Sequence, residues 1–282
     1  MIIHTVINLF RYTDYVITTM QKRILLTNDD GVNSDGLWAA YEALTPFGDV
    51  MVCAPATQQS AVGRSISIFE PIRASQVMHN GKVAYAVGGT PTDSVIIGLH
   101  ALKWNPDIVV SGINIGENLS YESIMTSGTV GAALEASNQG VFGVAFSLQV
   151  EDQGDKFGHS LFSSDMFIGV KRVISEIMCQ IFQNGFPLNV DVINVNIPSR
   201  IQGGYKITHL AEKLFVTGVE ERLDPRGRPY YWINGPLIKD AKEGTDVHAI
   251  AQGEISVTPI TLDCTAYSGK ESLKQTLAGL LS

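Results

Sequence analysis

The sequence has little of the chemistry that marks disulfide-stabilised, zinc-binding or nucleic-acid-coating proteins. Its 282 residues include three cysteines, Cys53, Cys179 and Cys264, which are far apart and never spaced Cys-x-x-Cys. An odd, scattered set predicts neither a disulfide framework nor a thiolate zinc site. The formal net charge of -8 disfavours sequence-independent binding to nucleic acid, which needs a basic surface. We therefore expect a reducing, cytoplasmic setting and no nucleic-acid polymer as partner.

Charged residues are also scarce, at 17%, whereas apolar residues make up 45% of the chain. This balance excludes a disordered chain, and 282 residues suffice for one large domain. We expect residues 22–282 to form that single domain.

Long hydrophobic runs are missing as well. The apolar start of the chain is interrupted by His4, Arg11 and Asp14, so it is too broken to span a bilayer. It also lacks the basic start and small-residue cleavage site of a signal peptide. We expect no membrane contact, and we interpret residues 1–21 as an extension, with the natural start at Met20.

Several motifs of phosphate chemistry are missing too. The sequence has no Gly-x-x-x-x-Gly-Lys-Ser/Thr loop, no Gly-x-Gly-x-x-Gly turn and no Asp-x-Asp after its first predicted strand. These absences disfavour a P-loop enzyme, a dinucleotide-binding fold and an aspartyl-phosphate mechanism. The histidines are scattered, and His248, near a predicted helix start, is better interpreted as a structural hydrogen bonder than as a catalytic base.

What the sequence does contain is a buried strand that ends at two adjacent carboxylates. Ile24, Leu25 and Leu26 form a continuous apolar run, typical of a parallel strand covered on both faces. Asp29 and Asp30 follow in a turn, where the strict alternation of side chains is lost and both carboxylates can converge. Two converging carboxylates need a cation. Asp-Asp-Gly is also an ordinary turn sequence, so this stretch alone leaves both interpretations open.

Two further predicted strands, Asp49–Ala54 and Asp107–Ser111, are also followed by side chains that carry oxygen. Ser60 follows the first and Asn114 the second. Each also fits an ordinary loop role. A helical pattern between the first two strands makes a βαβ unit with parallel strands, and ligands bind beyond the carboxyl ends of such strands. Together with the two aspartates, these residues would supply only oxygens, the donor set of Mg²⁺, Mn²⁺ or Ca²⁺ rather than zinc.

Two predicted helix starts offer backbone N–H groups that can hold phosphate. One is Gly88–Asp93, where capping by Thr90 is the simpler explanation. The other is Ser127-Gly128-Thr129, where cap and phosphate site are equally supported. These three residues and Asn118 are our candidates for binding substrate.

The overall pattern of apolar runs predicts the fold class. We expect an α/β three-layer sandwich, Rossmann-like, with a mostly parallel sheet and helices on both faces. Ser65–Phe69 and Val83–Val87 are predicted as short strands outside that pattern, and Tyr121–Ser127 as a loop. Residues 205–262 change to short β-like runs, including an aromatic hairpin that folds back on its own domain or meets another subunit.

The sequence resembles the SurE family, the stationary-phase survival proteins that act as metal-dependent 5'/3'-nucleotidases. Several motifs match in the same order over about residues 22–262: Ile24-Leu25-Leu26-Thr27-Asn28-Asp29-Asp30-Gly31, Gly89-Thr90-Pro91-Thr92-Asp93, Ser111-Gly112-Ile113-Asn114, Ser127-Gly128-Thr129-Val130, Asp224-Pro225-Arg226-Gly227, Gly244-Thr245-Asp246 and Ser256-Val257-Thr258-Pro259. The chain departs from the family in having Ser60-Ala61 where Ser-Gly is common, and in the extension before Met20.

The resemblance implies that Asp29, Asp30, Ser60 and Asn114 hold one divalent cation per subunit, Mg²⁺ or Mn²⁺. It also implies hydrolysis of nucleoside 5'- and 3'-monophosphates, with Asp29 and Asp30 as catalytic residues. It further implies a hairpin region exchanged within a homodimer, with a tetramer as the alternative. An exopolyphosphatase, a sugar phosphatase and a non-catalytic nucleotide- or metal-binding module remain as competing hypotheses.

Overall fold

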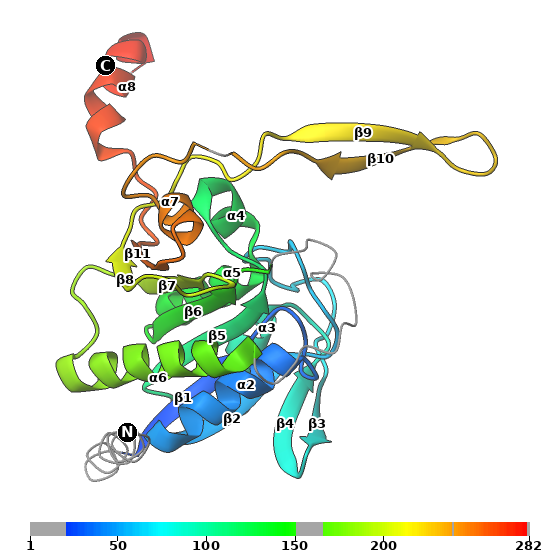
Figure 1. The fold of residues 1–282 in the computed structure, drawn as a ribbon, viewed down its shortest axis with the longest axis vertical. Helices are drawn as coiled ribbons and strands as arrows, with labels where there is room; N and C mark the ends of the chain where they lie inside the picture. Colours follow the sequence, from blue (N-terminus) through cyan, green and yellow to red (C-terminus); the bar gives the residue numbers. More distant parts are fainter. Residues whose placement is uncertain (1–20, 151–165, 239, 281–282) are drawn as a thin grey trace.

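The computed structural model describes residues 21–150, 166–238 and 240–280, and it forms a layered α/β body with one projecting hairpin (Figure 1). The strands are β1 (Lys22–Thr27), β2 (Gly48–Pro55), β3 (Ala74–His79), β4 (Lys82–Val87), β5 (Ile108–Ile115), β6 (Phe142–Leu148), β7 (Val192–Ile197), β8 (Tyr205–Ile207), β9 (Gly218–Leu223), β10 (Pro229–Asn234) and β11 (Ile255–Ile260). The helices are α2 (Asp35–Leu44), α3 (Pro91–Ile96), α4 (Ser120–Thr126), α5 (Gly128–Asn138), α6 (Met166–Asn184), α7 (Asp246–Ala251) and α8 (Lys270–Thr276). Shorter helical turns are η1 (Thr45–Phe47), η2 (Ile97–Ala101), η4 (Tyr267–Gly269) and η5 (Ala278–Leu280). The predicted extension, apart from Gln21, lies outside the described residues.

Nine of the described strands form one large sheet in the order β3-β4-β2-β1-β5-β6-β7-β11-β8, and β9 and β10 form a separate two-stranded hairpin. Pairing is parallel from β4 through to β7, and β3 and β11 are the antiparallel additions to β4 and β7. The predicted mostly parallel α/β sheet is therefore confirmed.

The first strand shows how the three layers form. Ile24 and Leu26 point to one face of the sheet, where they pack with buried residues of α2 and α6. Leu25 points to the opposite face, where it packs with α3 and α5. Because all three side chains are fully buried, the centre of the strand must be continuously apolar, as the sequence indicated.

Two sequence-based expectations were wrong near β4. Ser65–Phe69 is a loop rather than a strand, because Ser67 donates both its N–H and its hydroxyl to the Asp93 carboxylate, at 2.9 and 2.7 Å, instead of pairing in a sheet. The strand that precedes the Asn80-Gly81 turn is β3, further along the chain. It forms a hairpin with β4 at the edge of the main sheet, not outside it.

The segment Tyr121–Ser127, expected to be a loop, contains most of α4. The residue before this helix, Leu119, supplies no side-chain cap. Distant segments satisfy its first N–H groups instead: Ser120 donates to the Asp246 carboxylate at 2.7 Å, and Tyr121 donates to the carbonyl of Ala211 at 2.9 Å. The helix start therefore depends on tertiary contacts, which a local pattern does not reveal.

The carboxyl ends of β2, β1 and β5 lie side by side at one edge of the sheet, because β1 pairs with both neighbours. The turns that follow them carry Ser60, the aspartate pair and Asn114. The fold thus meets the first condition for a shared site. No helix within the described ranges is long and apolar enough to cross a membrane.

Asp246 provides the first prediction, because its carboxylate accepts N–H groups from Ser120, Ala211 and Val247, at 2.7 to 2.8 Å. Asp246→Ala leaves these three donors without an acceptor. Each unsatisfied buried donor costs about 1–3 kcal/mol, so we expect a loss of roughly 3 kcal/mol or more in the free energy of unfolding, measured by urea denaturation. The exposed Asp240 is the control, and a similar loss in Asp240→Ala would contradict this role.

Candidate active site

A pocket of about 240 Å³ lies at this edge of the sheet and brings together most of the residues singled out from the sequence. Its lining includes all four residues predicted to bind a cation, together with Asn118 and Ser127. The remaining lining residues, which the sequence did not single out for this role, are Gln58, Ala61, Ile115, Gly116, Glu117, Ser123, Thr126, Leu214 and Phe215. Gly128 and Thr129 do not line it.

The Asp29 carboxylate accepts hydrogen bonds from the first residues of α5. The Thr129 hydroxyl donates to its Oδ1 at 2.5 Å, and the backbone N–H groups of Gly128 and Thr129 also bond to the carboxylate. A Cβ at Gly128 would lie 2.8 Å from the Asp29 Cβ, so glycine permits this close approach. Burial nevertheless raises the pKa of Asp29, because desolvation outweighs these bonds. Gly128 and Thr129 therefore position the Asp29 carboxylate. Their contact with substrate stays a prediction.

Asp30 is partly buried and has weaker partners. The Ile115 N–H donates to its Oδ2 at 3.1 Å, and the Gln58 side-chain amide donates to its Oδ1 at 3.4 Å. Burial, and secondly the neighbouring Asp29 charge, raise the pKa of Asp30 from 3.8 to about 7. Asp30 has fewer and longer hydrogen bonds than Asp29.

The two neutral oxygens reach the pocket by different routes. Asn114 follows a register shift in β5, the kind of irregularity that re-aims a side chain. Its Nδ2 donates to the Gly116 carbonyl at 2.6 Å, which leaves Oδ1 without a partner among the described residues. Ser60 is exposed, on a loop tied to the aspartate turn by the bond from the Gln59 N–H to the Asp29 carbonyl at 2.7 Å.

Asn118 is fixed by a buried polar network under the pocket. Its N–H donates to Asn196 Oδ1 at 2.8 Å, and its carbonyl accepts from the side-chain amides of Asn194 and Asn196 at 2.9 and 3.0 Å. Its own Nδ2 donates to the Ser147 hydroxyl at 2.8 Å. These partners lie on β6 and β7, far from Asn118 in the sequence, so the residues next to Asn118 gave no sign of them.

Ser127 is a helix cap that also lines the pocket. Its Oγ accepts the Val130 N–H at 3.1 Å, so the capping interpretation is confirmed. The hydroxyl proton is not used by that bond, so Ser127 can still donate into the pocket.

The donor set fits a hard divalent cation. Among the described residues, no group of three or more His, Cys, Asp or Glu side chains is placed to hold a metal. A cation here would therefore rest on two carboxylates and neutral oxygens, which suits Mg²⁺ or Mn²⁺ and not zinc. The raised pKa of Asp30 supports this fit, because a cation would offset the burial and the neighbouring Asp29 charge that raise it.

Fold and site together define a class: a doubly wound α/β protein with an oxygen-lined, two-carboxylate pocket at the carboxyl edge of its sheet. The family model described as "Survival protein SurE" matches residues 24–217. The chain belongs to the SurE family.

Known relatives support this assignment along the whole domain. A protein named 5'-nucleotidase SurE from Methanoculleus marisnigri is 69% identical over 261 residues, covering 93% of this chain and 99% of that protein. A protein of the same name from Methanoregula boonei is also 69% identical, over 256 residues, covering 91% of this chain and 98% of that protein. The crystal structure of the SurE protein from Aquifex aeolicus matches with a TM-score of 0.75 at 36% identity, covering 90% of this chain and 99% of that one.

The carboxylate pair predicts an unusual pH dependence of stability. The pKa of Asp30 is raised on folding, so the folded state holds its proton more tightly than the unfolded state does. Its contribution to stability is therefore present below about pH 4 and is lost as pH rises towards about 7. We expect the midpoint of thermal unfolding of chelator-treated protein to fall over this range, and the Asp30 contribution to that fall to be missing in Asp30→Asn. An identical pH profile in the two proteins would refute the assignment.

Proposed function

We propose that the protein is a divalent-metal-dependent phosphomonoesterase that hydrolyses nucleoside 5'-monophosphates, and 3'-monophosphates as well, to nucleoside and phosphate. The observation that carries the proposal is the single pocket in which two carboxylates meet two neutral oxygens and two phosphate-binding candidates. The names of the relatives support the nucleotidase activity. Metal dependence and 3' activity rest on the chemistry of the pocket and on the family resemblance.

In this proposal one Mg²⁺ or Mn²⁺ is held by Asp29, Asp30, Ser60 and Asn114. Such a cation supplies Lewis-acid polarisation of a phosphoryl oxygen and lowers the pKa of bound water. The Thr129 hydroxyl fixes the Asp29 carboxylate, and both Asp29 and Asp30 line the pocket that would hold the cation. Asn118 and Ser127 orient the phosphate beside them through their polar groups.

The test of the metal role is Asp30→Asn. We expect kcat/KM for adenosine 5'-monophosphate to fall at least about hundredfold, because one anionic ligand is lost. The rise in thermal unfolding midpoint on adding Mn²⁺ should also be much smaller than in the parent protein. The metal-free variant should be at least as stable as the parent, because Asn removes a buried charge and its repulsion with Asp29. Full activity of the variant at limiting Mn²⁺ would contradict the role.

Asp29→Asn is also expected to abolish turnover, but it is the less specific test. The Asp29 carboxylate accepts from Thr129 and from the start of α5, so an amide NH₂ there would face donors and lower stability. The matched control is Asp240→Asn, an exposed carboxylate outside the pocket.

A substrate panel separates this activity from its competitors. Nucleoside 5'- and 3'-monophosphates, polyphosphate of defined chain length and a sugar phosphate are compared for phosphate release with and without Mn²⁺. Preference for polyphosphate or sugar phosphate would replace the proposal. Binding without release of phosphate from any of these would indicate a non-catalytic module.

We also propose a homodimer built through the β9–β10 hairpin, which projects from the body in Figure 1. Its apolar side chains are exposed, including Trp232 at 57% and Ile233 at 80%. An isolated two-stranded hairpin is marginally stable in water, so these side chains require a surface to cover them. A tetramer is the alternative assembly.

The assembly is tested by the double substitution of Trp232 and Ile233 to serine. We expect a monomer in light scattering coupled to gel filtration, because one exposed apolar side chain is removed from each face of β10. Glu221→Gln, on the facing strand, is the control that keeps these side chains. An unchanged mass in the double variant would exclude the hairpin as the interface.

A further inference from the structure

Strand β7 carries two fully buried asparagines, Asn194 and Asn196, and all its other residues are apolar. Asparagine is depleted in strands, and an amide buried without partners is destabilising. The Oδ1 of Asn194 has no hydrogen-bond partner among the described residues, so its burial is not fully offset. A strand that served only the core would carry apolar residues at both positions. The reason for the two amides therefore lies outside the strand.

Both amides bond to the backbone of one residue, Asn118. Asn196 pairs with it as a neighbouring strand would, because its Oδ1 accepts the Asn118 N–H at 2.8 Å and its Nδ2 donates to the Asn118 carbonyl at 3.0 Å. Asn194 donates to the same carbonyl at 2.9 Å. Because β5 has already ended at Ile115, side chains of β7 take the place of strand pairing at Asn118.

Ser147 of β6 fixes the side chain of the same residue. Its Oγ accepts one hydrogen of the Asn118 Nδ2 at 2.8 Å. Ser147 and Asn196 are register partners in neighbouring strands, so they act from the same face of the sheet. The Asn118 amide nitrogen carries a second hydrogen, which can donate to a ligand in the pocket that Asn118 lines. The backbone and the side chain of Asn118 are thus both held by adjacent strands.

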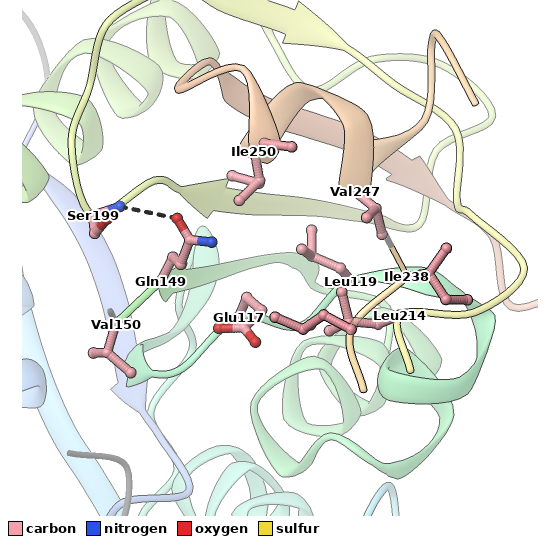
Figure 2. Close-up of a pocket in the computed structure, with 11 residues that line it drawn as sticks. Glu117, Leu119, Gln149, Val150, Ser199, Leu214, Ile238, Val247 and Ile250 are labelled. Atoms are coloured by element: carbon pink, nitrogen blue, oxygen red, sulfur yellow. Dashed lines mark hydrogen bonds between the residues drawn. The ribbon is translucent and has the colours of Figure 1, made fainter. Parts of the chain in front are cut away.

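Apolar packing holds the next residue, Leu119. Its buried side chain packs with Leu214, Val247 and Ile250 (Figure 2). Such packing is non-directional, so it places the chain without fixing how one peptide is turned. The hydrogen bonds from β6 and β7 supply that direction at Asn118.

We propose that Asn196, together with Asn194 and Ser147, positions Asn118 to bind the phosphate of the substrate. None of the three lines the pocket, so each acts through Asn118 and is a positioning residue. β7 lies three strands along the sheet from β1, which carries the aspartate turn. The inference rests on the proposed phosphomonoesterase activity and assigns part of its affinity for phosphate to residues buried in β6 and β7.

The test is the binding of inorganic phosphate in saturating Mg²⁺ or Mn²⁺, measured by titration calorimetry. Asn196→Leu keeps a similar side-chain volume and removes both backbone bonds, so we expect the dissociation constant to rise at least about tenfold. Ser147→Ala releases only the Asn118 side chain, and a rise of at least about fivefold is expected. KM for adenosine 5'-monophosphate should rise in the same proportion, with a smaller change in kcat.

A double-mutant cycle separates positioning from a general loss of stability. The Asn118→Ala background has no amide to position, so Asn196→Leu and Ser147→Ala should each change the dissociation constant there by less than about twofold. The matched control is Thr258→Val, which removes a buried hydroxyl from β11. Thr258 is opposite Asn194 and bonds to Thr208, so this variant should stay within about twofold of the parent protein.

Losses that add up in the cycle, or parental dissociation constants in both Asn196→Leu and Ser147→Ala, would overturn the inference. Hydrolysis of nucleoside monophosphates by the parent protein would still support the proposed function in that case. If Asn196→Leu does not fold, Ser147→Ala and its cycle decide alone. Coupled binding of phosphate without hydrolysis of any phosphomonoester would overturn the proposed function and leave the positioning role in place, and a parent protein that binds no phosphate would overturn both.

Discussion

The constraint on which the site depends is the placement of two neighbouring carboxylates in one poorly hydrated turn. Burial raises the pKa of Asp29, and burial together with the Asp29 charge raises the pKa of Asp30, so the fold works against both charged forms. The surrounding sheet stabilises this arrangement. Buried side chains of β1 pack on both faces, which fixes where the strand ends and where the turn begins. Two adjacent carboxylates whose pKa values are both raised are typical of ligand-binding sites rather than of turns that serve only the fold.

The two aspartates are not equivalent. Asp29 faces the start of α5, where a helix dipole, two N–H groups and the Thr129 hydroxyl all favour a negative charge. Asp30 has one backbone donor at 3.1 Å and one amide at 3.4 Å. The start of α5 thus donates several hydrogen bonds to Asp29, whereas Asp30 has two longer bonds and lines the pocket. This asymmetry is the reason for proposing one cation at the pocket.

The sequence predicted the elements whose signals are local, and it missed those that depend on distant contacts. The apolar run of β1, the Thr90 capping box and the Ser127 cap were readable because each uses residues within a few positions. The start of α4 was not, because its N–H groups bond to Asp246 and Ala211, far along the chain. Glu117 and Leu214 were missed as pocket residues for the same reason, since nothing in their own neighbourhood marks them.

Four aspartates of the recognisable motifs, Asp29, Asp30, Asp93 and Asp246, show how hydrogen bonds separate structural from chemical roles. Asp93 accepts three bonds that fix the loop after Ser60 and the start of α3, and Asp246 accepts three that fix α4 and α7. Both accept three donors at 2.7 to 2.9 Å, so these two carboxylates hold the surrounding backbone and side chains in place. Asp30 has the longest bonds of the four and lines the pocket. An acidic residue in a family motif is therefore not evidence of chemistry by itself, and its unsatisfied charge is the better guide.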